Sequence, residues 1–320
     1  MPRTTTEEMK KGIFTITVLI AIAVGFFGCK RHELDPNIET VDNQAILNYI
    51  SVHGITGMKR DTVGGDTSGI YYQVILPGTA GTKYAYSDSL DFVFTLRSFD
   101  GNYTSLDTNS VNHFENYAGH IYSSGYPYGL QIVIHDVLAR GGAIRVLIPS
   151  HLAYGVSGYG SGSSKNVNTR IAGNQCLDYY IHAITNRATY DDAVIRQYFA
   201  TNAITGYTRT SDGLYYKVTT PPTSGYVAIT DNSNVSMTYT GTQLNGTIFD
   251  QYNTTDGTGT AFDMPDVVKG MREGLENYMG TGGQISLYIP SPLGYGKNAF
   301  GTLPANSVMH FEIAVISTIP

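Results

Sequence analysis

The side chains in the last third of the chain that could do chemistry are an aspartate, a tyrosine and several aromatic rings. Asp250 directly follows Phe249 in the stretch Gly246-Thr-Ile-Phe-Asp, and Tyr295 lies between two glycines. A carboxylate can accept a hydrogen bond and polarise a site, and a phenol can donate one to a substrate carbonyl. Each residue, taken alone, is more often a core aromatic or a turn acceptor. None of them is a nucleophile paired with a base.

Sequence motifs for other chemistries are missing. There is no His-Glu-x-x-His, no Gly-x-Ser-x-Gly and no glycine-rich phosphate-binding loop. The eight histidines are scattered, and no pair at metal-ligand spacing has a third ligand nearby, so we expect no metal and no cofactor. The net charge is −6 and there is no long basic run, which argues against nucleic-acid binding.

The chain repeats itself once. The stretch Asp42-Asn-Gln-Ala-Ile-Leu-Asn-Tyr49 returns as Asp191-Asp-Ala-Val-Ile-Arg-Gln-Tyr198, and Ile148-Pro-Ser150 returns as Ile289-Pro-Ser291. The copies are 149 positions apart at the first stretch and 141 at the second, which is typical of short deletions in the second copy. We therefore predict two homologous domains, a first module at residues 42–185 and a second module at residues 186–320.

Each module is predicted to open with a short helix and to continue as strands around a second helix. In the second module, Asn245-Gly246 is a two-residue hairpin signal, and residues 270–279 have the apolar spacing of a helix. Alternating apolar and polar residues predict strands at 235–239, 285–289 and 309–315. This order indicates an α+β fold, an antiparallel β-sheet wrapped around a short α-helix, with a small preceding helix.

Several short stretches of the second module carry a family resemblance. They are Tyr239-Thr-Gly241, Gly246-Thr-Ile-Phe249-Asp250, Val267-Val268-Lys-Gly270-Met271, Ile289-Pro-Ser291, Gly294-Tyr295-Gly296, Leu303-Pro304 and Phe311-Glu-Ile313. Together they resemble the FKBP-type peptidyl-prolyl cis-trans isomerases, in the order of that family, across about residues 213–318. One such stretch is weak evidence, whereas the whole set in register is specific.

The resemblance implies a shallow aromatic bowl between sheet and helix. It assigns catalytic roles to Asp250, Tyr295 and Phe249. It assigns substrate contacts to Tyr239, Phe262, Val267, Val268, Met271, Leu303 and Phe311. The usual tryptophan at the floor of the family's bowl is Met271 here, and because methionine is smaller and more flexible, we expect a softer floor.

The reaction of this family needs no nucleophile, in agreement with the absence of nucleophile motifs from the sequence. Rotation about an X–Pro amide breaks resonance and crosses a barrier of about 18–20 kcal/mol, but no new bond forms. An apolar bowl strips water from the amide and so favours the twisted, less polar state. The resemblance therefore implies a cofactor-free isomerase that acts on proline-containing polypeptides and assists the folding of exported proteins.

The first module keeps the fold signals but has lost most pocket signals. Thr104-Ser105 replace Phe249-Asp250. When the two modules are aligned by sequence, Phe94 is at the position of Tyr239, and Pro127-Tyr128 are at the positions of Val267-Val268. We interpret this module as a degenerate FKBP-like domain that holds substrate or acts as a spacer.

The N-terminus is predicted to be a targeting segment. Lys10-Lys11 precede an apolar run over residues 13–27, which is shorter than the roughly 20 residues of a membrane-spanning helix and suits a signal peptide. The run ends in Gly28-Cys29, which resembles a bacterial lipobox, although Phe26-Phe27 stand where that motif has leucine and a small residue.

The lipobox resemblance implies a signal peptide over residues 1–29, lipidation of Cys29 and a polar tether over residues 30–41. The expected location is the bacterial cell envelope, with the lipid anchor in the outer membrane at its periplasmic or surface face. An uncleaved N-terminal anchor helix is the alternative. Two other functions remain open, a non-catalytic envelope lipoprotein that binds peptides or proteins through FKBP-like domains, and a purely structural lipoprotein.

Overall fold

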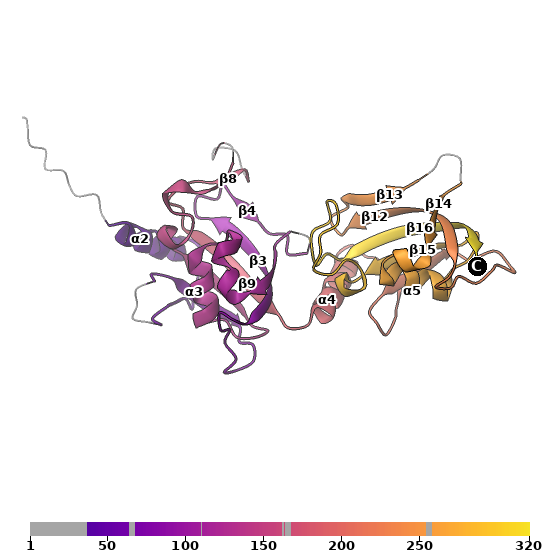
Figure 1. The fold of residues 1–320 in the computed structure, drawn as a ribbon. Coiled ribbons are helices and arrows are strands. Elements are labelled where there is room, and N and C mark those ends of the chain that lie inside the picture. The colour runs from indigo at the N-terminus through magenta and orange to yellow at the C-terminus, as the bar shows by residue number, and fades with distance from the viewer. Residues whose placement is uncertain (1–36, 64–67, 110, 162, 164–167, 254–257) are drawn as a thin grey trace, which may run out of the picture. The chain divides into compact units, whose positions relative to one another are not determined.

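The computed structural model describes residues 37–63, 68–109, 111–161, 163, 168–253 and 258–320 (Figure 1). The predicted signal peptide, Cys29 and most of the tether lie outside the described residues. The chain separates into residues 1–41 and residues 42–320, and the second of these parts contains both predicted modules. Within the described ranges, every helix is too short or too polar to cross a membrane.

The first module is built on a seven-stranded antiparallel sheet of order β1-β2-β6-β9-β3-β4, with β5 beside β3. Its strands are β1 (Lys59–Arg60), β2 (Tyr71–Leu76), β3 (Ser89–Ser98), β4 (Thr104–Ser105), β5 (His113–Tyr117), β6 (Ala143–Ile148) and β9 (Leu177–Ile184). A separate pair joins β7 (Tyr159–Gly160) to β8 (Arg170–Ile171).

Two helices cover the faces of this first sheet. The helix α3 (Tyr128–Asp136) buries Leu130, Val133 and Ile134 in the main core. The helix α2 (Ile38–Val52) packs Ile46 and Tyr49 against Leu147 on the other face. Short 3-10 helices complete the module, η1 (Ala118–His120), η2 (Tyr122–Ser124), η3 (Ser150–Leu152) and η4 (Gly155–Ser157).

The second module repeats this plan. Its seven-stranded antiparallel sheet has the order β10-β11-β15-β16-β12-β13, with β14 beside β12. The strands are β10 (Thr208–Arg209), β11 (Tyr215–Thr220), β12 (Asn234–Gln243), β13 (Ile248–Tyr252), β14 (Thr260–Asp263), β15 (Gln284–Ile289) and β16 (Met309–Ile319). Since corresponding strands occupy corresponding places in both sheets, the topology supports the internal repeat.

The helices of the second module lie on opposite faces of its sheet. The helix α5 (Lys269–Tyr278) shares a core with β12, β15 and β16, and α4 (Arg187–Thr201) packs Ile195 against Tyr215 and Tyr288. Two 3-10 helices flank the α5 side, η5 (Met264–Asp266) and η6 (Ser291–Leu293). Along β12 the residues alternate between buried and half-buried, so the period of two seen in the sequence becomes one core-facing row. The predicted α+β fold of antiparallel sheets and short helices is confirmed.

Two glycines bring α5 close to β15. A Cβ on Gly270 would lie 2.6 Å from Ile289 Cγ2, and one on Gly274 would lie 2.8 Å from Leu287 Cδ2. In the first module, Gly129 has the same relation to Ile148, whose Cγ2 would lie 2.6 Å from an added Cβ. Because any side chain here would push the helix off the sheet, these glycines mark equivalent positions in the two copies.

This equivalence corrects the sequence alignment by one residue. Pro127 precedes α3 with φ −55° and ψ 140°, and Val268 precedes α5 with φ −59° and ψ 147°. Pro127 therefore corresponds to Val268, and Tyr126, rather than Pro127, corresponds to Val267. The sequence alignment missed this because it placed a gap inside the first turn of the helix.

Candidate functional site

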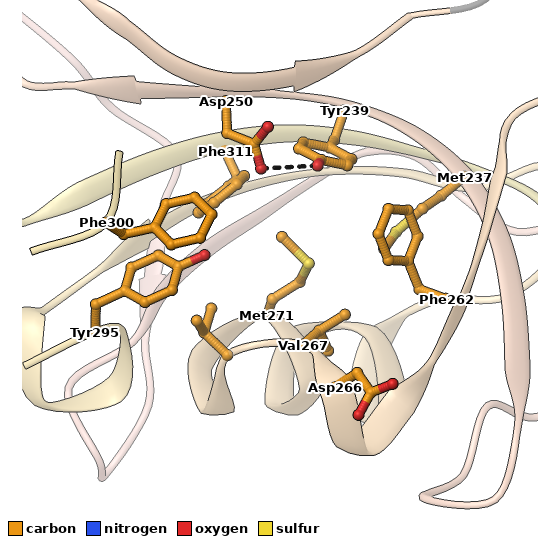
Figure 2. A pocket seen from close by; sticks show the side chains of 11 residues that line it. Met237, Tyr239, Asp250, Phe262, Asp266, Val267, Met271, Tyr295, Phe300 and Phe311 are labelled. Carbon is orange, nitrogen blue, oxygen red and sulfur yellow. Dashed lines mark hydrogen bonds between the residues drawn. The ribbon is translucent and has the colours of Figure 1, made fainter. Parts of the chain in front are cut away.

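A cavity of about 280 Å³ opens between the second sheet and α5 (Figure 2). Its lining is mostly aromatic and aliphatic, with two carboxylates and two phenol groups. The residues are Met237, Tyr239, Asp250, Phe262, Asp266, Val267, Val268, Met271, Tyr295, Phe300 and Phe311. A volume near the low end of ligand-binding pockets suits one small ring and its neighbouring atoms.

The sheet wall of the pocket carries a hydrogen-bonded pair. Strands β12 and β13 place Gly241 opposite Asp250, and the Tyr239 hydroxyl donates to Asp250 Oδ2 at 2.8 Å. Burial, together with the neighbouring Asp250 carboxylate, raises the pKa of Tyr239 well above its usual value. Tyr239 therefore stays protonated at neutral pH and holds the Asp250 carboxylate in one orientation.

The floor of the pocket is formed by Met271 from α5 and Phe311 from β16, which are 5% and 2% exposed. Phe249 meets Phe311 edge-on at 5.5 Å between ring centroids. Gly241 makes this packing possible, because a Cβ there would lie 2.8 Å from Phe311 Cε1 and 2.9 Å from Phe249 Cζ. The Phe311 ring is thus fixed from behind by a neighbour outside the pocket lining.

The loop after β15 supplies the remaining phenol. Tyr295 stacks on Phe300 with the ring centroids 4.3 Å apart and the planes 6° from parallel. Its hydroxyl points into the pocket (Figure 2) and makes no hydrogen bond within the described part of the chain. Burial, and to a lesser extent the Asp250 charge, raises the pKa of Tyr295, so its hydroxyl keeps the proton that it can donate.

The Tyr295 loop is held in place from α4. The Ser291 backbone N–H and hydroxyl donate to Asp191 Oδ2 at 2.7 and 2.6 Å, and the Gly296 N–H donates to the Ser291 carbonyl at 2.9 Å. Burial raises the pKa of Asp191 to about 6, although the hydrogen bonds from Ser291 act in the opposite direction. Asp191 therefore anchors the loop that presents Tyr295.

Most of the residues predicted from the sequence meet in this pocket. The structure brings together Tyr239, Asp250, Phe262, Val267, Val268, Met271, Tyr295 and Phe311. Phe249 and Leu303 are outside the lining, since Phe249 packs against Phe311 and Leu303 is buried in the module core at 1% exposure.

Three lining residues were missed by the sequence analysis, namely Met237, Asp266 and Phe300. Met237 could have been found, because it precedes Tyr239 by two positions on the same strand face. Asp266 directly precedes Val267, and a neighbour of a site residue is a weak signal. Phe300 lies in a loop, where no periodicity indicates the direction of a side chain.

Within the described ranges, no three histidine, cysteine, aspartate or glutamate side chains are grouped to hold a metal ion. The apolar lining of the pocket can exclude water from a bound amide, while Asp250 can accept a hydrogen bond and Tyr295 can donate one.

The part of the chain that carries this pocket is similar to a known protein family. Residues 225–316 match the family model described as FKBP-type peptidyl-prolyl cis-trans isomerase. The second module belongs to this family.

Curated relatives of the FKBP-type module include several proteins named FKBP-type peptidyl-prolyl cis-trans isomerase FkpA. The protein from Aeromonas hydrophila is 33% identical over 149 residues, covering 45% of this chain and 54% of the relative. The protein from Escherichia coli strain K12 is 34% identical over 115 residues, covering 36% and 41%. The chain thus spans about half or less of the length of these relatives.

Among solved structures, the chain is similar to the crystal structure of FkpA from Escherichia coli, with 32% identity and a TM-score of 0.36. The match covers 42% of this chain and 61% of that one.

The first module differs from the FKBP-type module at the place of the pocket. The strand registers pair Phe94 with Ile181 and Tyr239 with Ile313, so Phe94 occupies the position of Tyr239. Tyr126, the counterpart of Val267, places its ring edge-on to Phe94 at 5.6 Å and to Phe114 at 5.5 Å. The first module's own aromatic side chains therefore pack into the region where the FKBP-type module has its cavity.

Proposed function

We propose that the second module catalyses cis-trans isomerisation of X–Pro bonds in its aromatic pocket. The observation that carries this proposal is the opposed pair of polar groups in an apolar cavity. Asp250 is oriented by the Tyr239 hydroxyl, and the Tyr295 hydroxyl points into the cavity without a protein acceptor among the described residues. An isomerase needs such a site because it must hold a twisted amide without forming a bond to it.

The catalytic sequence starts with the proline ring packing against Met271 and Phe311. This burial removes water from the amide and so destabilises the planar state, whose carbonyl oxygen carries more negative charge. Tyr295 donates a hydrogen bond to a substrate carbonyl and fixes one side of the bond while the other side turns. Every 1.36 kcal/mol removed from the barrier accelerates the rotation about tenfold.

A prolyl-peptide isomerisation assay on the full chain tests the proposal. We expect Asp250→Ala to lower kcat/KM, whereas Ser105→Ala, at the equivalent position of the first module, leaves it unchanged. Binding of a proline peptide without any rate enhancement would instead select the non-catalytic binding function, which the softer Met271 floor favours. Neither binding nor catalysis would leave a structural protein.

We propose further that the chain is an exported, lipid-anchored folding helper of the bacterial envelope. The support comes from the sequence alone, namely the Lys10-Lys11 pair, the apolar run at residues 13–27 and the Gly28-Cys29 junction. Mass spectrometry of the protein purified from membranes tests this, with an acylated N-terminal Cys29 as the expected species. An uncleaved, unmodified N-terminus would refute it.

A further inference from the structure

The pocket of the second module has two carboxylates and no cation in its lining. Figure 2 shows Asp250 on the sheet side and Asp266 on the helix side, next to Val267. Asp250 accepts a hydrogen bond from the Tyr239 hydroxyl. Asp266 is exposed and has no hydrogen-bond or ion-pair partner among the described residues. The rim therefore presents one carboxylate that is free to meet a ligand.

Nearby cations do not neutralise Asp266. The Lys269 ammonium, three residues further along, lies 3.2 Å from Asp212 Oδ2. The Arg272 guanidinium lies 3.6 Å from Asp231 Oδ1. Both cations of the first turn of α5 thus pair with other carboxylates. The negative charge of Asp266 at the pocket rim is therefore not neutralised by them.

Asp266 is the last residue of η5 and does not cap the helix α5 that follows. An aspartate just before a helix commonly caps the first turn by accepting a backbone N–H. Here the N-cap position of α5 is Val268, and no side chain caps this end. The neighbouring Asp263, by contrast, accepts a hydrogen bond from Asn234 Nδ2 at 2.7 Å. A carboxylate that neither caps nor pairs is available for recognition.

We propose that Asp266 makes this pocket prefer X–Pro segments that carry a lysine or arginine next to the proline. The inference rests on the proposed isomerase function and adds a substrate class to it. With the proline ring on Met271 and Phe311, a flanking side chain leaves the pocket over its rim, where a long cationic chain reaches Asp266. An exposed ion pair of this kind changes kcat/KM by about two- to fivefold, and salt screens it.

Three peptides that differ only in the residue beside the proline test this on the full chain, with lysine, glutamine or glutamate there. The wild type is expected to act fastest on the lysine peptide and slowest on the glutamate peptide, with the spread narrowing at high ionic strength. In Asp266→Asn, the three rates are expected to converge. Glu39→Gln on α2 removes one charge outside the pocket lining and is expected to keep the wild-type order.

Each contrary outcome has its own meaning. Equal wild-type rates on all three peptides would overturn the preference and leave the isomerase function intact. A lysine preference that persists in Asp266→Asn would overturn the assignment to this residue. No acceleration of any peptide would overturn the isomerase function and the preference with it.

Discussion

Tyr239 donates its hydroxyl to Asp250 Oδ2 at 2.8 Å across the β12–β13 pair, and this bond sets the polar wall of the pocket. The donor comes from the core-facing row of β12 and the acceptor from the neighbouring strand. In the first module, Phe94 and Ser105 occupy these two positions, so neither the donor nor the carboxylate is present there. The pair therefore distinguishes the FKBP-type module from the first module.

Tyr239→Phe is expected to lower kcat/KM severalfold, because Asp250 loses the hydrogen bond that orients it. The free energy of unfolding should fall by about 0.5–1.5 kcal/mol, the usual net contribution of one hydrogen bond. Prolyl-peptide kinetics and urea unfolding measure the two effects. Tyr252→Phe on the exposed side of β13 is the control. If Tyr239→Phe behaves like Tyr252→Phe in the kinetics, Asp250 needs no orientation.

Tyr295→Phe is expected to lower kcat about three- to tenfold, since one neutral hydrogen bond to the substrate is worth about 1 kcal/mol. Stability should not change, because the hydroxyl has no protein partner among the described residues. The control is Tyr154→Phe, whose ring stacks on Tyr159 at 4.6 Å in the corresponding loop of the first module. Equal activity of the two variants would remove Tyr295 from the reaction.

Gly241→Ala is expected to destabilise the second module by about 1–3 kcal/mol, because the added methyl overpacks the Phe249–Phe311 contact. Displacement of the Phe311 ring should also weaken substrate binding. Thermal unfolding and KM report these effects, with Thr238→Ala on the same strand as the control. A Gly241→Ala variant of wild-type stability and KM would show that the two rings tolerate a wider spacing.

Met271→Trp is expected to raise the affinity for a proline-containing peptide, because a larger rigid ring fills part of the 280 Å³ cavity and enlarges the contact with proline. KM should fall while kcat stays close to the wild-type value. Steady-state kinetics with one prolyl peptide separates the two parameters. Weaker binding by a folded Met271→Trp variant would mean that the pocket needs the flexibility of methionine.

Asp191 should make stability depend on pH in a defined window. Burial raises its pKa in the folded state from 3.8 to about 6, so between these values the folded protein binds more protons than the unfolded chain. The contribution of Asp191 to the free energy of unfolding therefore falls as pH rises from about 4 to about 6, by at most about 3 kcal/mol.

The stability difference between wild type and Asp191→Asn isolates this effect, because other titrating groups cancel. Urea unfolding at pH 4.5 and at pH 7 measures this difference. Relative to Asp191→Asn, the free energy of unfolding of the wild type is expected to be lower at pH 7 than at pH 4.5. An identical difference at both pH values would show that the Ser291 hydrogen bonds compensate fully for burial.

The sequence by itself determined the α+β class and the alternation along β12, β15 and β16, whereas the pocket residues were implied by the family resemblance. These features are local or periodic, so residues such as Tyr239, Ile285 and Phe311 reveal their faces through neighbours two positions away. The resemblance then placed Asp250 and Tyr295 in one site.

Only the tertiary structure decided which polar groups form hydrogen bonds and which side chains lie at the place of the pocket in each module. The Tyr239–Asp250 hydrogen bond, the Tyr295–Phe300 stack and the packing of Tyr126 against Phe94 join residues from different strands and loops. Such contacts depend on how loops close over a sheet, and no short-range pattern encodes that closure. The same fold thus presents a cavity in the second module, whereas Tyr126 packs edge-on against Phe94 at the corresponding place in the first module.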